Sequence, residues 1–244
     1  MSSSLPHSYA PHGNKRPVKE NIERSYKKHK ARNPSKLTQL PFEIITSIFI
    51  LSSNPELPLV CTALFQQLYR SPDDIKLEWL LFRHDNNITQ ALEAGLRFRF
   101  FSLSLLSKFD LRHGSEIRLT NKTIPPYMFA SPDYHDLVTT LLERGASPHK
   151  PQGYPIIKSA QIGNLQMVKT LVAHGADASA RGNMALRACA ARANMEILLY
   201  FLDDLQIKPD SDTLNVCAQK ELWHIVKILV DHGAVPDIST INSA

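Results

Sequence analysis

Apolar positions in the C-terminal half of the chain recur with a period of about thirty residues. The segment 141–146 reads Leu-Leu-Glu-Arg-Gly-Ala, and closely related segments follow at 171–176 and 229–234. A fourth copy at 195–204 keeps the apolar spacing, but Leu205 stands in the place of the glycine. A recurrence of this length predicts repeated units that stack along the chain rather than a single globular core.

Each apolar segment ends like a helix and is preceded by a shorter helical pattern. A glycine directly after the last apolar residues is typical of a left-handed C-terminal cap. The shorter patterns carry a small residue at the position that faces the neighbouring unit, which lets helix pairs pack closely. We expect these first helices at 125–131, 155–161, 185–191 and 213–219, with Ala130, Ala160, Ala190 and Ala218 at the interfaces. The pairs predict an all-α helix-turn-helix solenoid.

Two helices near the start of the folded part carry more apolar surface than a small unit can bury. In the first of them, Ile44, Ile48 and Leu51 fall on one stripe, and Ile45 and Phe49 form a second stripe beside it. A helix needs only one such stripe to join its own core. Surplus apolar groups on two short helices therefore indicate a docking surface for another protein.

The pattern predicts how the chain is organised. A weaker helix pair is expected upstream of the repeats, at 75–82 and 88–95, whereas 96–122 has no pattern that we assign and is expected to be irregular. In chain order we predict a disordered basic tail at 1–35, a short helical domain at 36–72 with helices at 40–51 and about 57–69, a degenerate repeat-like or irregular stretch at 73–124, about four repeats at 125–238 and a tail at 239–244.

The net charge of +5 is concentrated near the N-terminus. Nine basic and two acidic residues precede position 37, whereas the rest of the chain has 19 basic and 21 acidic residues. Residues 1–35 have few large apolar side chains and cannot offset the entropy cost of folding. Their basic clusters resemble a bipartite nuclear-import signal, formed here by Lys15, Arg16, Lys27, Lys28 and Lys30. The resemblance implies an import receptor as partner and a location in the nucleus, the cytoplasm or both. The alternative is a solvated basic tail, whose lysines contact nucleic acid without sequence specificity.

Nothing in the sequence indicates catalysis. The chain has no glycine-rich phosphate loop, no Gly-x-Ser-x-Gly elbow and no constellation for acid–base chemistry. We therefore expect a non-catalytic protein without a cofactor or a metal site. No stretch approaches the roughly 20 apolar residues that cross a bilayer. We also expect no secretory signal at the start, so the three cysteines are expected to be reduced.

The cysteines and histidines of the repeats are interpreted as structural. Cys189 and Cys217 occupy the same repeat position, directly before a small alanine, which favours packing over reactivity. His174 and His232 stand at equivalent last-turn positions, where an imidazole can bond to helix carbonyls that have no other partner.

Residues 37–69 resemble the F-box, the motif that anchors proteins to the Skp adaptor of cullin-based ubiquitin ligases. The matching positions, which the resemblance implies bind the Skp adaptor, are Leu40, Pro41, Glu43, Ile44, Ile45, Ile48, Phe49, Leu51, Leu59, Val60, Cys61, Leu64 and Phe65. The chain departs from the family in two ways. The interval from Pro41 to Cys61 is shorter than usual, and Phe65 stands where tryptophan is often found. The alternative is a helical cap that closes the first repeat and binds no adaptor.

The repeats themselves resemble ankyrin repeats. The segment 154–157, Tyr-Pro-Ile-Ile, is similar to the opening of an ankyrin unit, and 174–177, His-Gly-Ala-Asp, is similar to its ending. The resemblance covers about 125–237, in units shorter than usual, and implies a concave face that binds a protein. The residues that map to this face are His149, Lys150, Gln152, Lys158, Gln161, Arg181, Asn183, Arg187, Arg192, Asp210, Asn215 and Gln219. The middle of this face is basic, so we expect it to favour an acidic partner segment.

The two resemblances together imply a substrate-recognition adaptor of an SCF-type (Skp–cullin–F-box) ubiquitin ligase. The F-box-like helices would bind the Skp subunit and the cullin core through it, and the ankyrin repeats would bind the substrate protein. The alternative is a nuclear ankyrin-repeat scaffold without a ligase role. Neither function involves a membrane, and sequence-specific binding of nucleic acid is not expected.

Overall fold

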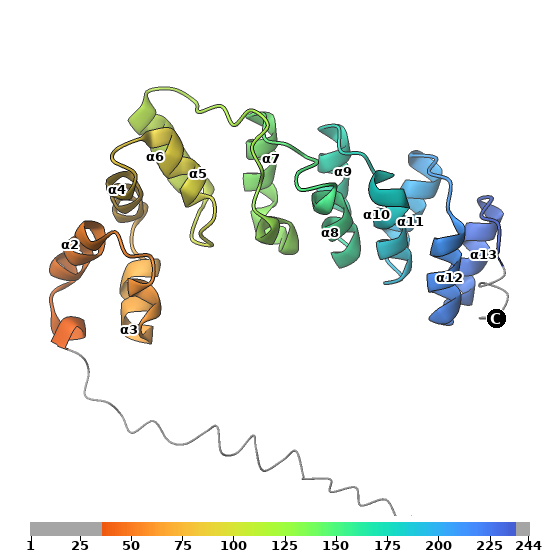
Figure 1. The fold of residues 1–244 in the computed structure, drawn as a ribbon, viewed down its shortest axis with the longest axis horizontal. Coiled ribbons are helices and arrows are strands. Elements are labelled where there is room, and N and C mark those ends of the chain that lie inside the picture. Colours follow the sequence, from red (N-terminus) through yellow and green to blue (C-terminus); the bar gives the residue numbers. More distant parts are fainter. Residues whose placement is uncertain (1–35, 238–244) are drawn as a thin grey trace, which may run out of the picture. The chain divides into compact units, whose positions relative to one another are not determined.

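The computed structural model describes residues 36–237 and is all-α over that range (Figure 1). Its described residues contain no strand, only an isolated bridge between Thr123 and Ser147. The predicted all-α class is therefore confirmed. The chain divides into two compact units, Met1–Ile45 and Thr46–Ala244. The predicted import residues, Lys15, Arg16, Lys27, Lys28 and Lys30, lie outside the described residues.

The N-terminal helices are shorter and more broken than the sequence pattern predicts. The described chain begins with η1 (Lys36–Gln39), and α2 (Phe42–Ser52) follows. The second helix, expected as one element at about 57–69, is instead divided into η2 (Leu57–Leu59), α3 (Thr62–Leu64) and η3 (Phe65–Tyr69). The division falls at Cys61, whose backbone is extended with φ −157° and ψ 162°.

Three further helices precede the repeats. These are α4 (Asp73–Arg83), α5 (Ile88–Gly95) and α6 (Leu103–His113), and α4 packs against the other two. The first two confirm the weak upstream helix pair, but α6 corrects the expectation that 96–122 is irregular. The signals for α6 were present in the sequence. Ser102 caps the helix by accepting a hydrogen bond from the Leu105 amide at 3.2 Å, and Gly114 ends it with φ 80°.

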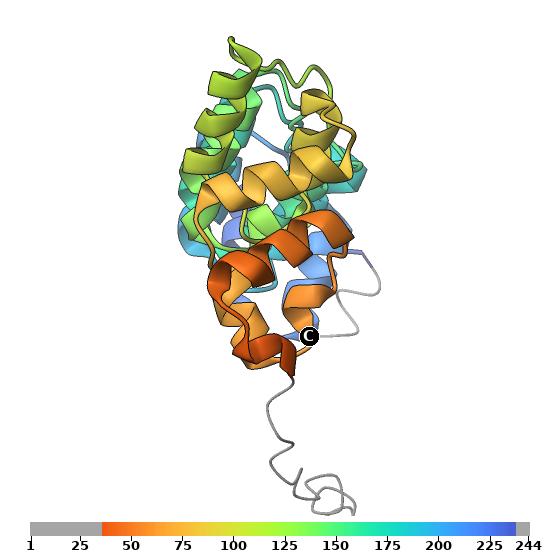
Figure 2. The ribbon, with the colours of Figure 1, turned by 90° about the vertical axis from the view of Figure 1, so that its left-hand side faces the viewer.

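The repeats follow as helix pairs that lie side by side (Figure 1), and Figure 2 looks along the row, so that successive pairs overlap. The first helix of each unit contacts the first helix of the next, from η4 through α8 and α10 to α12. In chain order the elements are η4 (Pro126–Ala130), η5 (Pro132–Tyr134), α7 (His135–Glu143), α8 (Tyr154–Ile162), α9 (Leu165–Ala173), α10 (Ala180–Ala190), α11 (Met195–Leu199), η6 (Tyr200–Asp204), α12 (Ser211–Gln219) and α13 (Trp223–Asp231).

Three of the four predicted small interface residues are buried. Ala160 and Ala190 are 0% exposed and Ala218 is 1% exposed, as close packing of helix pairs requires. Ala130, in contrast, is exposed. The first unit begins with a 3-10 turn, which has three residues per turn and so directs its side chains differently from an α-helix. Met128 and Phe129 fill the interface in place of the alanine, and both are 0% exposed.

The glycines close the second helices of three units as predicted. Gly145, Gly175 and Gly233 have φ of 92°, 90° and 88°, and in each case the next amide bonds to a carbonyl five residues back at 2.9–3.0 Å. In the remaining unit, where Leu205 stands in the place of the glycine, the left-handed residue is the next one, Gln206, with φ 53°. The physical reason is a π-helical turn, η6, which adds one residue to the helix.

Candidate protein-interaction surfaces

The two apolar stripes of α2 have opposite environments. On one stripe, Ile45 is 0% exposed and Phe49 is 3% exposed. On the other, Ile44 is 49% exposed, Ile48 is half-buried and Leu51 is 67% exposed. One stripe therefore satisfies the helix's need for a core, and the other remains available to a partner.

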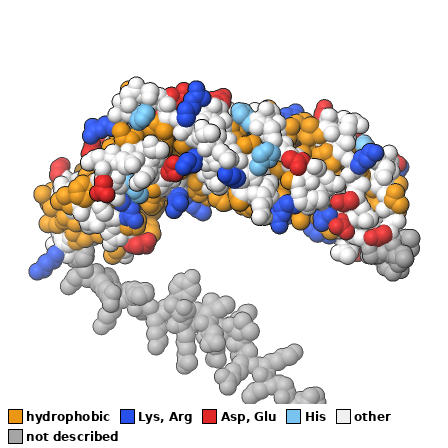
Figure 3. Space-filling model, turned by 45° about the horizontal axis from the view of Figure 1, so that its top comes forward, with side chains coloured by type: hydrophobic (Ala, Val, Ile, Leu, Met, Phe, Trp, Pro, Cys, Tyr) orange, Lys and Arg blue, Asp and Glu red, His pale blue; other side chains and the backbone are white. Residues whose placement is uncertain are grey.

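The segments after α2 show the same division. Leu64 and Leu68 are each 1% exposed, whereas Leu59 is 58% exposed and Val60 is 70% exposed. Figure 3 shows apolar side chains gathered over the part of the molecule that carries these helices. Of the remaining predicted adaptor-binding residues, Leu40, Pro41 and Glu43 are exposed, and Cys61 and Phe65 are half-buried.

The buried side of α2 is fixed by an aromatic contact with α4. The ring of Phe49 stacks on Trp79 with centroids 4.8 Å apart and planes 9° apart. Phe98 approaches the same indole edge-on at 5.3 Å, and the Arg83 guanidinium lies 5.6 Å from its centroid. Trp79 is 1% exposed, and its indole nitrogen has no hydrogen-bond partner among the described residues. This contact orients the C-terminal part of α2, so the side that carries Leu51 faces away from α4.

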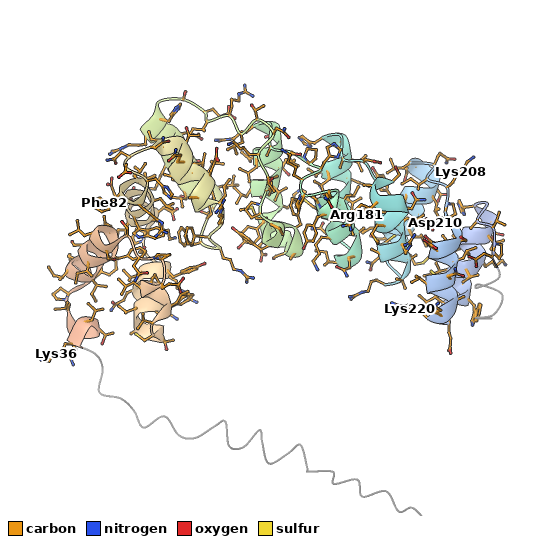
Figure 4. The ribbon with its side chains drawn as sticks, viewed as in Figure 1. Lys36, Phe82, Arg181, Lys208, Asp210 and Lys220 are labelled. Carbon is orange, nitrogen blue, oxygen red and sulfur yellow. The ribbon has the colours of Figure 1, made fainter. Side chains whose placement is uncertain are left out.

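The predicted concave-face residues lie along the first helices and the loops between repeats, and two of them, Arg181 and Asp210, are labelled in Figure 4. Several are already held by contacts within the chain. The Lys158 ammonium donates to the Gln161 side chain at 3.1 Å, and the Asn183 amide donates to the Lys208 carbonyl at 3.0 Å. The exposed members are His149, Lys150, Gln152, Arg181, Arg192 and Gln219, and the half-buried members are Lys158, Gln161, Asn183, Arg187, Asp210 and Asn215.

Arg187 is less available to a partner than the sequence suggests. Its Nη2 lies 2.9 Å from Asp212 and 3.3 Å from Asp210, and it also donates to the Gly182 carbonyl. Burial of Asp210 raises its pKa, but hydrogen bonds from Thr213 and the charge of Arg187 outweigh burial, so the pKa lies below its usual value. The basic centre predicted for this face is therefore partly neutralised. Asp212 was not among the residues predicted from the sequence. Asp210 could have been recognised as the cap of α12, because Asp210-x-x-Thr213 is a helix-capping pattern.

A left-handed turn presents Arg181. The residues Arg181, Gly182 and Asn183 have φ of 59°, 64° and 54°, so the regular part of α10 begins only after them. Two of these are not glycine, and the left-handed conformation costs such residues about 1–2 kcal/mol each. Arg181 is exposed and labelled in Figure 4.

The cysteines and histidines of the repeats have the structural roles predicted for them. Cys189 and Cys217 are each 0% exposed, and burial raises the pKa of the first thiol to about 12 and of the second to about 11. His174 and His232 contact the carbonyls of Thr170 and Ile228 through Nδ1, at 2.8 and 2.7 Å.

No group of three or more His, Cys, Asp or Glu side chains within 36–237 is placed to hold a metal ion. None of the helices described over that range is both long enough and apolar enough to span a bilayer.

Comparison with known proteins agrees with the geometry of the helix pairs. A search of curated proteins found no match to the chain. A family described as ankyrin repeats (3 copies) matches residues 127–213, which cover η4 through the start of α12. No F-box family matches residues 37–69, so that resemblance stays a prediction. Residues 127–213 therefore match ankyrin repeats, a module through which proteins bind other proteins.

Proposed function

We propose that this protein is the substrate-recognition adaptor of an SCF-type ubiquitin ligase. The observation that carries the proposal is the exposed apolar side of α2 and η2. Leu51 on α2, Leu59 on η2 and Val60 directly after η2 are 67%, 58% and 70% exposed. The core is already supplied by other side chains of this region, namely Phe49 on α2, Leu64 on α3 and Leu68 on η3. Exposed side chains of this size beside a complete core are typical of a protein-binding surface.

In this proposal the chain has no catalytic role of its own. The Skp subunit docks on the F-box-like helices, and the ankyrin repeats hold a substrate protein. The substrate's lysines are then kept near a recruited conjugating enzyme at high effective concentration, which is the source of the rate increase.

Binding of a purified Skp-type adaptor to the full chain tests the proposal. Ile44→Asp, Ile48→Asp and Leu51→Asp each place a charge in the proposed interface, and each is expected to weaken binding by about 2 kcal/mol or more. Calorimetric titration measures the affinity. Phe82→Asp is the matched control, because Phe82 is an exposed apolar residue (46%) on α4 that belongs to no proposed interface. Failure of the unmodified chain to bind the adaptor would contradict the proposal.

A second function, a nuclear ankyrin-repeat scaffold, is favoured by the stacking of Phe49 on Trp79. A helical cap must pack against the helices that follow it, and this contact packs α2 against α4. If the protein is a scaffold, the full chain should bind no Skp-type adaptor. Ile44→Asp and Leu51→Asp should then leave its affinity for other proteins unchanged. The adaptor titration therefore separates the two functions.

A further inference from the structure

Two apolar hollows lie on either side of Arg97, in the segment that joins α5 to α6. The first, of about 320 Å³, is lined mainly by Leu59, Phe65, Tyr69 and Phe98, with Arg97 and Arg99 at its edge. The second, of about 370 Å³, has Leu96, Pro125 and Pro126 in its lining, together with Thr123 and the charged side chains of Glu93, Lys122 and again Arg97. One positively charged side chain therefore stands between two apolar hollows that belong to the same compact unit.

The segment that carries Arg97 is held in place by hydroxyl groups from the first repeat. Tyr127 donates to the carbonyls of Leu96 and Phe98 at 2.9 and 2.8 Å, and Tyr134 donates to the Arg99 carbonyl at 3.1 Å. Burial raises the pKa of Tyr127, so its hydroxyl stays protonated and keeps donating near neutral pH.

Aromatic packing holds the same segment from its other side. Phe98 stacks on Phe100 with centroids 5.2 Å apart and meets Trp79 edge-on. Phe65 stacks on Tyr69, and Tyr69 meets Phe100 edge-on at 5.2 Å. The hollows are therefore formed before a ligand arrives, which lowers the entropy cost of binding.

The charges around the two hollows leave a positive charge at their junction. Arg97 is exposed and has no ion-pair partner among residues 36–237. The Arg99 guanidinium lies 5.9 Å from the Tyr127 ring centroid and has no carboxylate partner within that range either. Of the two acidic residues in the linings, Glu93 is paired with Lys122 at 2.7 Å, and Glu56 lines the first hollow only.

We propose that the two hollows and Arg97 together bind an extended segment of a partner protein. This segment carries a carboxylate between two apolar side chains, which serve as anchors. The carboxylate pairs with Arg97, and one anchor fills each hollow. In an extended peptide, alternate side chains point to the same side, so the anchors lie two residues before and two residues after the acidic residue. Arginine beside aromatic side chains is the composition found at binding hot spots. The proposal does not rest on the ligase function, because Arg97 belongs to no predicted adaptor or substrate surface. Leu59 and Phe65 of the first hollow are also predicted adaptor-binding residues, so Arg97→Glu is the variant that separates this site from the adaptor surface.

Selection of peptides from a displayed library of random twelve-residue segments, with the full chain as bait, tests this inference. We expect the enriched peptides to share Asp or Glu with apolar residues at the second position on either side. One enriched peptide is then labelled with a fluorophore, and its affinity is measured by anisotropy. Arg97→Glu should weaken binding by about tenfold or more, because the substitution replaces attraction by repulsion. Leu59→Ser, at an exposed position in the first hollow, should also weaken it.

Arg112→Glu is the matched control, since Arg112 is an exposed arginine in the last turn of α6 and lines neither hollow. It should leave the affinity unchanged. Thermal unfolding checks that the variants fold. The proposal is overturned if no sequence is enriched over a bait-free selection, if the enriched peptides lack a carboxylate, or if folded Arg97→Glu binds as well as the unmodified chain. Self-association of the chain that Arg97→Glu abolishes would show a second copy as the occupant and would also overturn it.

Discussion

The ring of Phe49 lies flat against the indole of Trp79, with centroids 4.8 Å apart. This contact joins α2 to α4 and determines which apolar side of α2 is buried. Because Phe49 and Trp79 are 3% and 1% exposed, the pair behaves as core rather than as surface. The other apolar side of the same helix, which carries Ile44 and Leu51, therefore stays exposed to solvent.

Phe49→Ala should destabilise the folded chain by about 3–5 kcal/mol, because it removes a buried aromatic ring and leaves a cavity against Trp79. Chemical denaturation measures the free energy of unfolding. Phe82→Ala is the control at an exposed aromatic position and should cost less than about 1 kcal/mol. Equal effects of the two substitutions would mean that the stacked pair is not part of the core.

The ion pair between Arg144 and Asp110 predicts a second large effect. Arg144 donates to both carboxylate oxygens, at 2.8 and 2.7 Å, and its side chain is only 9% exposed. Asp110→Asn should cost about 3 kcal/mol, because it removes the bidentate counter-charge of a buried guanidinium and leaves, among the described residues, only Glu116 at 3.4 Å from Nε to pair with it. Asp74→Asn, which breaks the exposed pair with Lys108, should cost no more than about 1 kcal/mol. Denaturant titration of both variants would reveal the difference, and similar costs would contradict the burial argument.

The left-handed conformation of Gln206 predicts a stabilising substitution. Gln206→Gly should stabilise the chain by about 1 kcal/mol, since glycine adopts φ 53° without a steric penalty. Gln166→Gly is the matched control. Gln166 is exposed in the first turn of α9, where glycine should destabilise the helix, by less than the roughly 1 kcal/mol of a helix interior. Thermal unfolding should therefore move in opposite directions for the two variants, and a lower melting temperature for Gln206→Gly would contradict the assignment of the cap.

His232 should make stability depend on pH. The hydrogen bond to Asp203, at 2.9 Å, and the Ile228 carbonyl raise the pKa of this imidazole above its usual value of 6.5. Protonation therefore favours the folded state. The contribution is fully present below pH 6.5 and is lost as the pH rises through the raised pKa. Titration followed by NMR should show the raised pKa, and Asp203→Asn should lower it. An unchanged His232 pKa in that variant would refute the role of Asp203.

The basic clusters outside the described residues predict a cellular phenotype. Replacing Lys27, Lys28 and Lys30 by alanine should abolish nuclear accumulation of a fused reporter that is too large to diffuse through nuclear pores, because the import receptor would lose one of two charge clusters. Fluorescence microscopy measures the distribution. Replacing Lys19 and Arg24, basic residues outside both clusters, is the control. An unchanged distribution of the triple variant would contradict the import signal and favour the alternative, a solvated basic tail without a receptor.

Much of the repeat architecture could be predicted, because the signals that specify it are local. The glycines at 145, 175 and 233 adopt the left-handed caps that their positions after an apolar segment indicate. The ends of helix α6 are also marked in the sequence, by Ser102 and Gly114. It was not predicted, because it does not belong to the thirty-residue repeat by which the other helices were recognised. The one-residue π insertion before Gln206 left no comparable sign, since a helix can absorb it without changing its apolar pattern.

Local sequence patterns are enough to specify that α2 has two apolar stripes, that the repeats are helix pairs and that positive charge gathers in the first 36 residues. Folding was needed to bury Phe49 while Leu51 stays exposed, to bring Asp210 and Asp212 to Arg187, and to place Arg97 between two hollows. Distance along the chain explains this division. Helix periodicity and caps depend on neighbours within about four residues, whereas burial and charge pairing depend on side chains that only folding brings together.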